Sequence, residues 1–154
     1  MPTSSPTAVE AVAGVDPAEV AARLRLSATR LARRLRQRAD AGLTPSQLSA
    51  LAVIHNHQPL TLGELAERER VAPPSVTKIV AKLERDGFVS RTPDPADRRV
   101  ANVATTEAGT ALIVESRRRK TAWLTSRIRD LTPDQQARLA AALDVLDEIA
   151  TVDE

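Results

Sequence analysis

Apolar residues recur at the three- and four-residue spacing of an amphipathic helix in six segments of this 154-residue chain. Most of these segments follow a helix-start signal, in which a hydroxyl or carboxylate side chain stands just before the first turn. The clearest signals are "DPAE", "TPSQ", "TLGE" and "TPDQ". The pattern predicts helices over about residues 16–40, 45–57, 62–69, 73–86, 107–129 and 133–151.

Two short stretches alternate between apolar and polar residues, which is the pattern of β-strands rather than helices. They are Phe88–Arg91 and Val100–Thr105, and the loop between them contains two prolines, two aspartates and two adjacent arginines. We therefore predict a β-hairpin here. Residues 1–15 are rich in Pro, Ser, Thr and Ala, a composition that predicts a disordered tail.

The predicted helix over 73–86 has one apolar face, and its other side is small, hydroxyl-bearing and basic. The apolar face consists of Val76, Ile79, Val80 and Leu83, and the outward residues are Pro74, Ser75, Thr77, Lys78, Ala81, Lys82 and Arg85. A side of this kind is most often only solvated. It is also what a DNA-reading helix presents: Ser75 and Thr77 for bases or phosphates, Lys78 and Lys82 for phosphates. The side alone leaves both interpretations open.

The segments that flank this helix in the sequence favour the interpretation that it binds DNA. A short helix, a turn and the 73–86 helix form a helix-turn-helix arrangement, whose second helix enters the major groove. The hairpin follows directly, and Arg98 and Arg99 at its tip would reach the adjacent minor groove. Asp97 is best placed to hold the Arg99 side chain in one rotamer, which lowers the ordering cost of binding.

Residues 43–109 resemble the winged helix-turn-helix core of the MarR (multiple-antibiotic-resistance regulator) family. The most specific part is "GFVSRTPDPADRRVANVATTEAG", where the wing turn is matched by Asp94, Pro95, Asp97 and Arg99, and the next helix start by Thr106 and Gly109. Asp94 and Asp97 are therefore expected to support the wing. The chain departs from the family at Thr105, where an aliphatic residue is usual, and at Pro73 and Pro74, which replace a polar start of the recognition helix.

The resemblance implies a mainly α-helical fold of six helices with a small β-hairpin wing. The DNA-binding lobe would span 43–106, and residues 16–42 and 107–151 would form a dimerisation region. Two copies would straddle a pseudo-palindromic operator, with half-sites about one helical turn apart. The terminal helices support a homodimer independently, because their Leu/Ala stripes need a surface to pack against, although packing within one chain would also cover them.

The amino-acid composition excludes several kinds of functional site. Cysteine is absent, which excludes disulfides, thiol nucleophiles and cysteine-ligated zinc. The formal charge is only +2, but 19 of the 22 basic residues are arginine, which binds phosphate with paired donors. A GC-rich genome would explain the arginine equally well. No apolar run approaches the roughly 20 residues of a membrane span and no signal peptide is visible, so we expect a cytoplasmic protein.

Other candidate sites are weaker. His55 and His57 do not share a helical face, so neither a metal nor another cofactor is expected. Trp123, with His55, is a candidate lining for a pocket that takes small aromatic or phenolic acids, as the family commonly does, although a lone Trp is more often core. The run "RRRK" at 117–120 is more often a solvated surface than a nucleic-acid contact. No nucleophile with its base is visible, so we expect no enzyme.

Together these patterns predict a sequence-specific regulator of transcription that binds double-stranded DNA. It would be a dimeric repressor, relieved when a ligand changes the spacing of its two lobes. Two alternatives stay open. One is a ligand-independent regulator or nucleoid-type binder, because the chain has few aromatic residues to build a pocket. The other is a winged helix that uses its basic side to bind an acidic protein.

Overall fold

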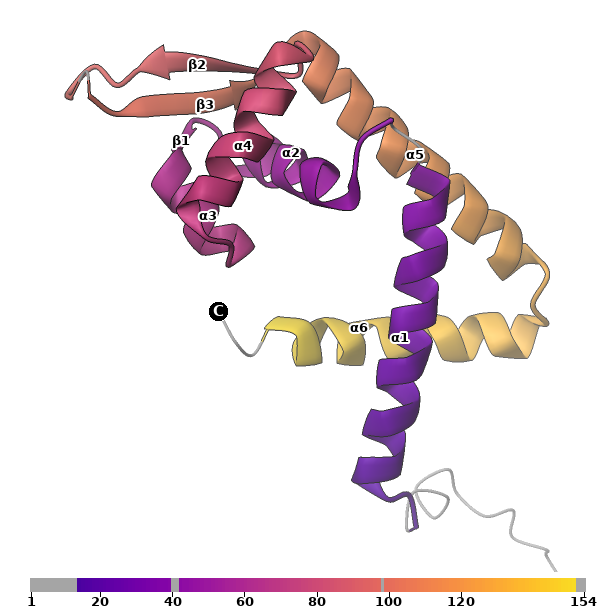
Figure 1. Ribbon diagram of the computed structural model, residues 1–154. Helices are drawn as coiled ribbons and strands as arrows, with labels where there is room; N and C mark the ends of the chain where they lie inside the picture. The colour runs from indigo at the N-terminus through magenta and orange to yellow at the C-terminus, as the bar shows by residue number, and fades with distance from the viewer. Residues whose placement is uncertain (1–13, 40–41, 98, 152–154) are drawn as a thin grey trace, which may run out of the picture. The chain divides into compact units, whose positions relative to one another are not determined.

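The computed structural model describes residues 14–39, 42–97 and 99–151 (Figure 1). The elements are α1 (Pro17–Ala39), α2 (Pro45–His57), β1 (Leu60–Thr61), α3 (Leu62–Glu69), α4 (Pro73–Arg85), β2 (Val89–Pro93), β3 (Ala101–Thr105), α5 (Glu107–Arg129) and α6 (Pro133–Thr151). The mainly helical fold with a small hairpin is confirmed. The chain divides into two compact units, Met1–Gln37 and Arg38–Glu154. The predicted disordered tail lies almost wholly outside the described residues.

Side-chain caps begin the helices where the sequence predicts them. The Thr44 hydroxyl accepts from the N–H of Gln47 at 3.3 Å, and the Gln47 side chain accepts from the N–H of Thr44 at 2.9 Å. Thr61 and Glu64 form the same reciprocal pair before α3, at 3.2 and 2.7 Å. Each pair satisfies donors that a first helical turn leaves unbonded. The backbone N–H of Thr61, and then its hydroxyl, lower the pKa of Glu64.

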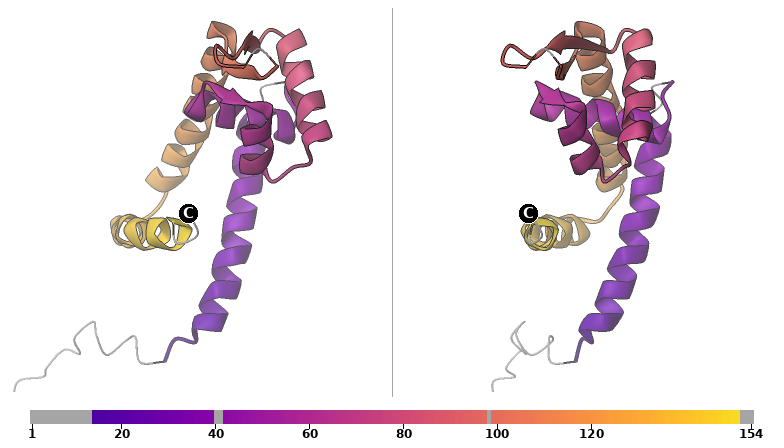
Figure 2. Two further views of the ribbon diagram at one scale, coloured as in Figure 1. Left: turned by 90° about the vertical axis from the view of Figure 1, so that its left-hand side faces the viewer. Right: turned by 60° about the vertical axis from the view of Figure 1, so that its left-hand side comes forward.

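Three strands form one antiparallel sheet, in which β3 lies between β1 and β2. β1 is two residues long, and its Leu60 pairs with Val103 of β3. A strand this short shows no alternation, so the predicted two-stranded hairpin was incomplete. In Figure 2 the β2–β3 hairpin extends beyond the neighbouring helices as a narrow arm.

The two hairpin strands differ slightly from their predicted bounds. β2 covers Val89–Pro93 where the pattern indicated Phe88–Arg91, and β3 begins at Ala101 rather than Val100. Pro93 can belong to β2 because this strand lies at the edge of the sheet, where a missing N–H need not remove a ladder bond. The hairpin itself is confirmed.

The hydrophobic core lies where α2, α3, α4, the sheet and the start of α5 meet. From α4, Val76, Val80 and Leu83 are at most 1% exposed, which confirms the predicted apolar face. α2 contributes Leu51 and Ile54, which are both fully buried. Burial of each large side chain contributes about 1.5–3 kcal/mol, so these contacts determine how α4 is oriented.

Thr105, the residue that departs from the family pattern, makes polar contacts at the end of β3. Its N–H and its hydroxyl both donate to the side-chain oxygen of Gln58, at 2.7 and 2.8 Å. In β3 only Val103 is fully buried, and the other four residues of the strand are half-buried. Hydrogen bonds to the end of α2 replace the apolar packing that an aliphatic residue would give.

The start of α5 is tied to the corner between α4 and β2. Gly87 ends α4 with a φ of +81°, a conformation that favours glycine. Thr106 donates its hydroxyl to the Gly87 carbonyl at 2.6 Å and its N–H to the Phe88 carbonyl at 3.0 Å. The backbone of Gly109 then lies so close to Phe88 that a Cβ would overlap its carbonyl oxygen. This corner directs the chain from α4 into the hairpin.

Gly109→Ala is expected to lower the free energy of unfolding by about 3 kcal/mol, because the added methyl group meets a backbone carbonyl that cannot move aside. Gly63→Ala is the matched control. A Cβ at Gly63 would meet nothing nearer than the Thr61 hydroxyl at 3.8 Å, so alanine should stabilise α3 by roughly 0.5–1 kcal/mol. Urea denaturation followed by circular dichroism measures both, and equal stabilities would contradict the close packing at Gly109.

Candidate nucleic-acid interface

α4 leads directly into the β2–β3 hairpin (Figure 1), and its polar side faces solvent. The exposed residues of this side are Pro73, Pro74, Ser75, Thr77, Lys78, Lys82, Glu84 and Arg85, whereas Ala81 is half-buried. Because the opposite side of α4 fills the core, the helix cannot turn these residues inward without exposing large apolar side chains. The outward side is therefore available to a partner.

The first turn of α4 offers no free backbone N–H from its first three residues. Pro73 and Pro74 have no N–H, and the N–H of Ser75 donates to the carbonyl of Ala72 at 2.9 Å. No side chain caps this helix. A helix N-terminus usually attracts phosphate through such donors, so here an anion must be bound mainly by side chains.

The two hydroxyls on this side of α4 differ in what they can offer. The Thr77 hydroxyl donates to the carbonyl of Pro73 at 3.0 Å, so only its lone pairs remain for a ligand. The Ser75 hydroxyl is exposed and makes no such bond within the described part of the chain. Ser75 can therefore both donate and accept, which Thr77 cannot do without rearranging.

The two lysines of α4 differ in whether an acid already neutralises them. Lys82 Nζ lies 2.6 and 2.7 Å from the two carboxylate oxygens of Asp86, whereas Lys78 has no acid within 4 Å among the described residues. The Lys82–Asp86 pair was not predicted from the sequence, although its i, i+4 spacing is a recognised signal. A phosphate at Lys82 must displace or share this partner, and Lys78 is the readier contact.

Asp94 organises the turn of the hairpin. One carboxylate oxygen accepts the N–H groups of Ala96 and Asp97 at 2.7 and 3.2 Å, and the other accepts from the amide of Asn102 at 2.9 Å. These donors hold the pKa of Asp94 below its ordinary value, the largest cause being the N–H of Ala96. One ionised carboxylate thus joins the turn to β3. The sequence predicted Asp94 as a support but not its partner Asn102.

Arg99 is held at its base and open at its tip. Asp97 accepts from the backbone N–H of Arg99 at 3.0 Å and from its Nε at 3.3 Å, so the predicted contact is confirmed. The side chain is still 93% exposed, and a pair this exposed adds little to stability. Arg98, which was predicted to bind DNA beside it, lies outside the described residues.

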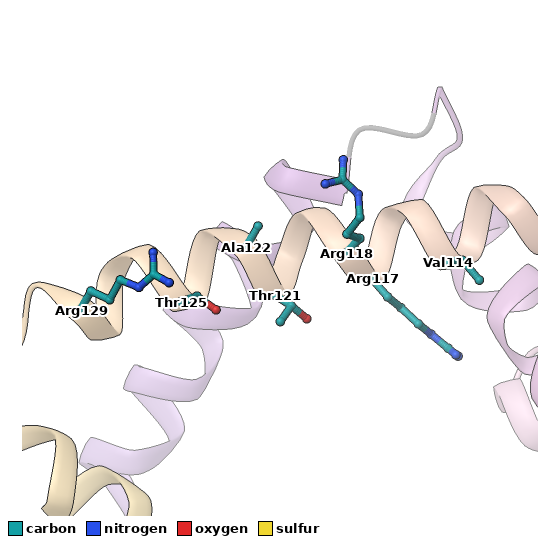
Figure 3. Close-up of a pocket in the computed structure, with 7 residues that line it drawn as sticks. All are labelled: Val114, Arg117, Arg118, Thr121, Ala122, Thr125 and Arg129. Atoms are coloured by element: carbon teal, nitrogen blue, oxygen red, sulfur yellow. The ribbon is translucent and has the colours of Figure 1, made fainter.

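An open pocket of about 610 Å³ runs along one side of α5 (Figure 3). It is lined by Val114, Arg117, Arg118, Thr121, Ala122, Thr125 and Arg129. The predicted pocket residues, Trp123 and His55, are not among them. The Trp123 ring is instead 5.9 Å from the guanidinium groups of both Arg38 and Arg127. A role for Trp123 and His55 in ligand binding stays a prediction.

The basic run at the middle of α5 is engaged by other protein groups. Arg117 donates to the side chain of Asn56 at 2.7 Å, and Arg118 donates twice to Glu115, at 2.7 and 2.9 Å. This pairing raises the pKa of Arg118 and lowers that of Glu115. The geometry favours a structural role for these arginines over a contact with nucleic acid.

Other site types find no support in the ranges 14–39, 42–97 and 99–151. No three His, Asp or Glu side chains there are grouped so that they could hold a metal ion. His55 has a buried Nδ1 that makes no hydrogen bond to another described group. Separately, none of the described helices combines the length and the apolar character needed to cross a membrane.

Comparison with known proteins gives consistent matches. The model of the MarR family matches residues 43–101. An uncharacterized HTH-type transcriptional regulator of Mycobacterium leprae is 41% identical over 133 residues, which are 86% of this chain and 93% of that protein. The HTH-type transcriptional repressor MdtR of Bacillus subtilis is 32% identical over 73% of each chain. The structure of a transcriptional regulator from Thermotoga maritima has a TM-score of 0.73 at 30% identity, over 85% of this chain and 93% of that one.

Asp94→Ala is expected to loosen the hairpin turn and leave the core folded, because it removes three hydrogen bonds at once. Amide hydrogen exchange at Ala96 and Asp97, measured by NMR, should become about tenfold faster, with α4 unaffected. Asp94→Asn keeps one accepting oxygen and should have a smaller effect. Unchanged exchange at both amides in Asp94→Ala would contradict this role.

In the wild-type protein the stability of the hairpin turn should decrease as the pH falls. The folded pKa of Asp94 lies below its ordinary value of 3.8, so its stabilisation is fully present above that pH and is lost as the pH falls through the folded value.

Proposed function

We propose, because this chain belongs to the MarR family of transcriptional regulators, that it is a homodimeric repressor whose hold on its operator is relieved by a small ligand. Membership of the family makes it a DNA-binding regulator of transcription, and the family is not one of enzymes. The dimer, the sign of regulation and the ligand are the parts that we infer. Acting on the chromosome, the protein would work in the cytoplasm.

The single observation that carries the proposal is the exposed polar side of α4, followed directly in the chain by a hairpin that presents an exposed Arg99. In the proposed complex α4 enters the major groove, where Ser75 meets a base edge or a phosphate and Lys78 binds a phosphate. Thr77 contributes only as an acceptor, and Lys82 binds after leaving its carboxylate partner. Arg99 enters the minor groove, where the negative potential is strongest when the groove is narrow.

Exposed apolar residues on the terminal helices support a dimer. On α1, Val20 and Leu31 are 47% and 44% exposed, and on α6, Leu143 and Ile149 are 52% and 59% exposed. Charge is complementary as well, because α1 carries seven arginines and one acid, whereas α6 carries four acids and one arginine. We infer that these helices pack against a second copy, which brings two recognition helices to a pseudo-palindromic operator. A monomer in sedimentation equilibrium at micromolar concentration would contradict this.

Repression and its relief by a ligand are inferred separately from the dimer. Repression is supported by the Bacillus subtilis relative MdtR, which is named a transcriptional repressor. A ligand would act by favouring a spacing of the two lobes that no longer fits the half-sites. The alternative is a regulator without a ligand, favoured by a composition with one Trp, one Phe and no Tyr. A thermal-shift screen against small phenolic acids separates the two, since the alternative expects no compound to stabilise the protein.

Arg99→Ala is expected to weaken operator binding by about tenfold, because it removes a guanidinium from the minor groove. The protein should stay folded, since the substitution breaks only an exposed ion pair with Asp97. Footprinting of the DNA upstream of its own gene identifies the operator. Fluorescence anisotropy on that duplex then gives the affinity, and thermal melting reports the fold.

Arg138→Ala is the matched control for this substitution. Arg138 is also exposed and paired with an aspartate, Asp134, but it lies on α6, away from the hairpin in sequence. With the dimer verified by sedimentation equilibrium, the loss of Arg138 should leave operator affinity unchanged. If Arg99→Ala binds as tightly as the wild type, the wing has no part in the interface. A steep fall of DNA affinity with salt, together with a remaining preference for the operator sequence, would argue against the acidic-protein alternative.

A further inference from the structure

One acid interrupts the basic side of α4. Glu84 is exposed in the last turn of the helix, between Lys82 and Arg85 in the sequence. A carboxylate close to DNA phosphates is repelled by them, so by itself it weakens binding. Its carboxylate, however, pairs with a residue of the wing: Oε2 of Glu84 lies 3.0 Å from Nε of Arg91 on β2.

Arg91 reaches α4 because of the register of the sheet. It pairs across the ladder with Val103, which is fully buried, so both side chains project from the face of the sheet that covers the core. The Arg91 side chain is only 26% exposed, and its Nε is shielded from solvent without an aligned hydrogen bond. Glu84 therefore neutralises a partly buried cation that water reaches poorly.

The ion pair joins two elements that must act together on one duplex. α4 and β2 are in direct contact, and only the corner Asp86–Phe88 connects them along the chain. The hairpin turn begins three residues beyond Arg91, which is roughly 10 Å of extended chain. A rotation of the hairpin at its base is therefore magnified at the tip, where Arg99 lies.

We propose that the Glu84–Arg91 ion pair is a positioning device, which sets the angle between the recognition helix and the wing. With the pair in place, α4 and Arg99 reach the same duplex without a further adjustment of the hairpin. This rests on the proposed function, in which both elements contact the operator. Glu84 itself touches no DNA in this arrangement and acts only through Arg91.

Glu84→Gln tests the proposal because a purely electrostatic role and a positioning role of Glu84 predict opposite changes in operator affinity. If Glu84 were only an acid near phosphates, its neutralisation would tighten operator binding. As a positioning residue, its loss frees the hairpin and should weaken binding by about fivefold. Anisotropy on the footprinted operator measures the affinity, and thermal melting verifies the fold. Binding equal to or tighter than that of the wild type would overturn the proposal.

Two further variants separate the effect of the position of the Glu84 carboxylate from the effect of its negative charge. Glu84→Asp keeps the negative charge but is one methylene shorter, so it should also weaken binding. Glu67→Gln removes the same charge from an exposed acid on neighbouring α3, which makes no ion pair with any described residue. This control should bind the operator as tightly as the wild type or slightly more so. Wild-type affinity in Glu84→Asp would overturn the proposal.

A double-mutant cycle tests whether Glu84 acts through Arg91. Arg91→Gln should weaken binding, and adding Glu84→Gln to it should cost no further affinity, because the pair is already broken. Independent, additive losses would overturn the proposal. Failure of the wild type to bind any upstream duplex would instead contradict the proposed function. If the wild type binds, Arg99→Ala weakens binding and Glu84→Gln does not, only the present inference fails.

Discussion

Burial of one side of α4 is the constraint on which the rest of this structure depends. Val76, Val80 and Leu83 complete a core shared with α2, α3 and the sheet, and rotating the helix would expose all three. At about 1.5–3 kcal/mol for each large side chain, such a rotation is far too costly. The polar side must therefore face outward, so the same packing that stabilises the lobe also selects the surface that we propose meets DNA.

The wing is built from polar contacts rather than from apolar packing. Asp94 binds two backbone N–H groups and Asn102, and Thr106 ties the base of the hairpin to the corner at Gly87. This construction suits a chain with an aromatic content of 1%, which has few large side chains to bury in a thin hairpin. The turn stays ordered with little buried area, and Arg99 can be presented almost fully to solvent.

Carboxylates accompany several of the cations in this region. Lys82 pairs with Asp86, Arg91 with Glu84 and Arg99 with Asp97. The formal charge of the whole chain is only +2, so attraction to DNA is expected to be local to the proposed interface rather than a property of the whole molecule. The paired acids also hold long side chains in place before binding, which reduces the entropy lost when a complex forms.

The sequence by itself determined the features that depend on neighbours within about four residues. These are the capped starts of α2, α3 and α5, the outward side of α4 and the aspartate-rich turn, because capping bonds and helical periodicity are local. Only the tertiary structure decided contacts between distant segments, such as β1 pairing with β3 and Gln58 bonding to Thr105. The Glu84–Arg91 pair belongs with these, although the two residues are close in sequence. It depends on the sheet register that turns Arg91 toward α4, and that register is set by long-range pairing and core packing.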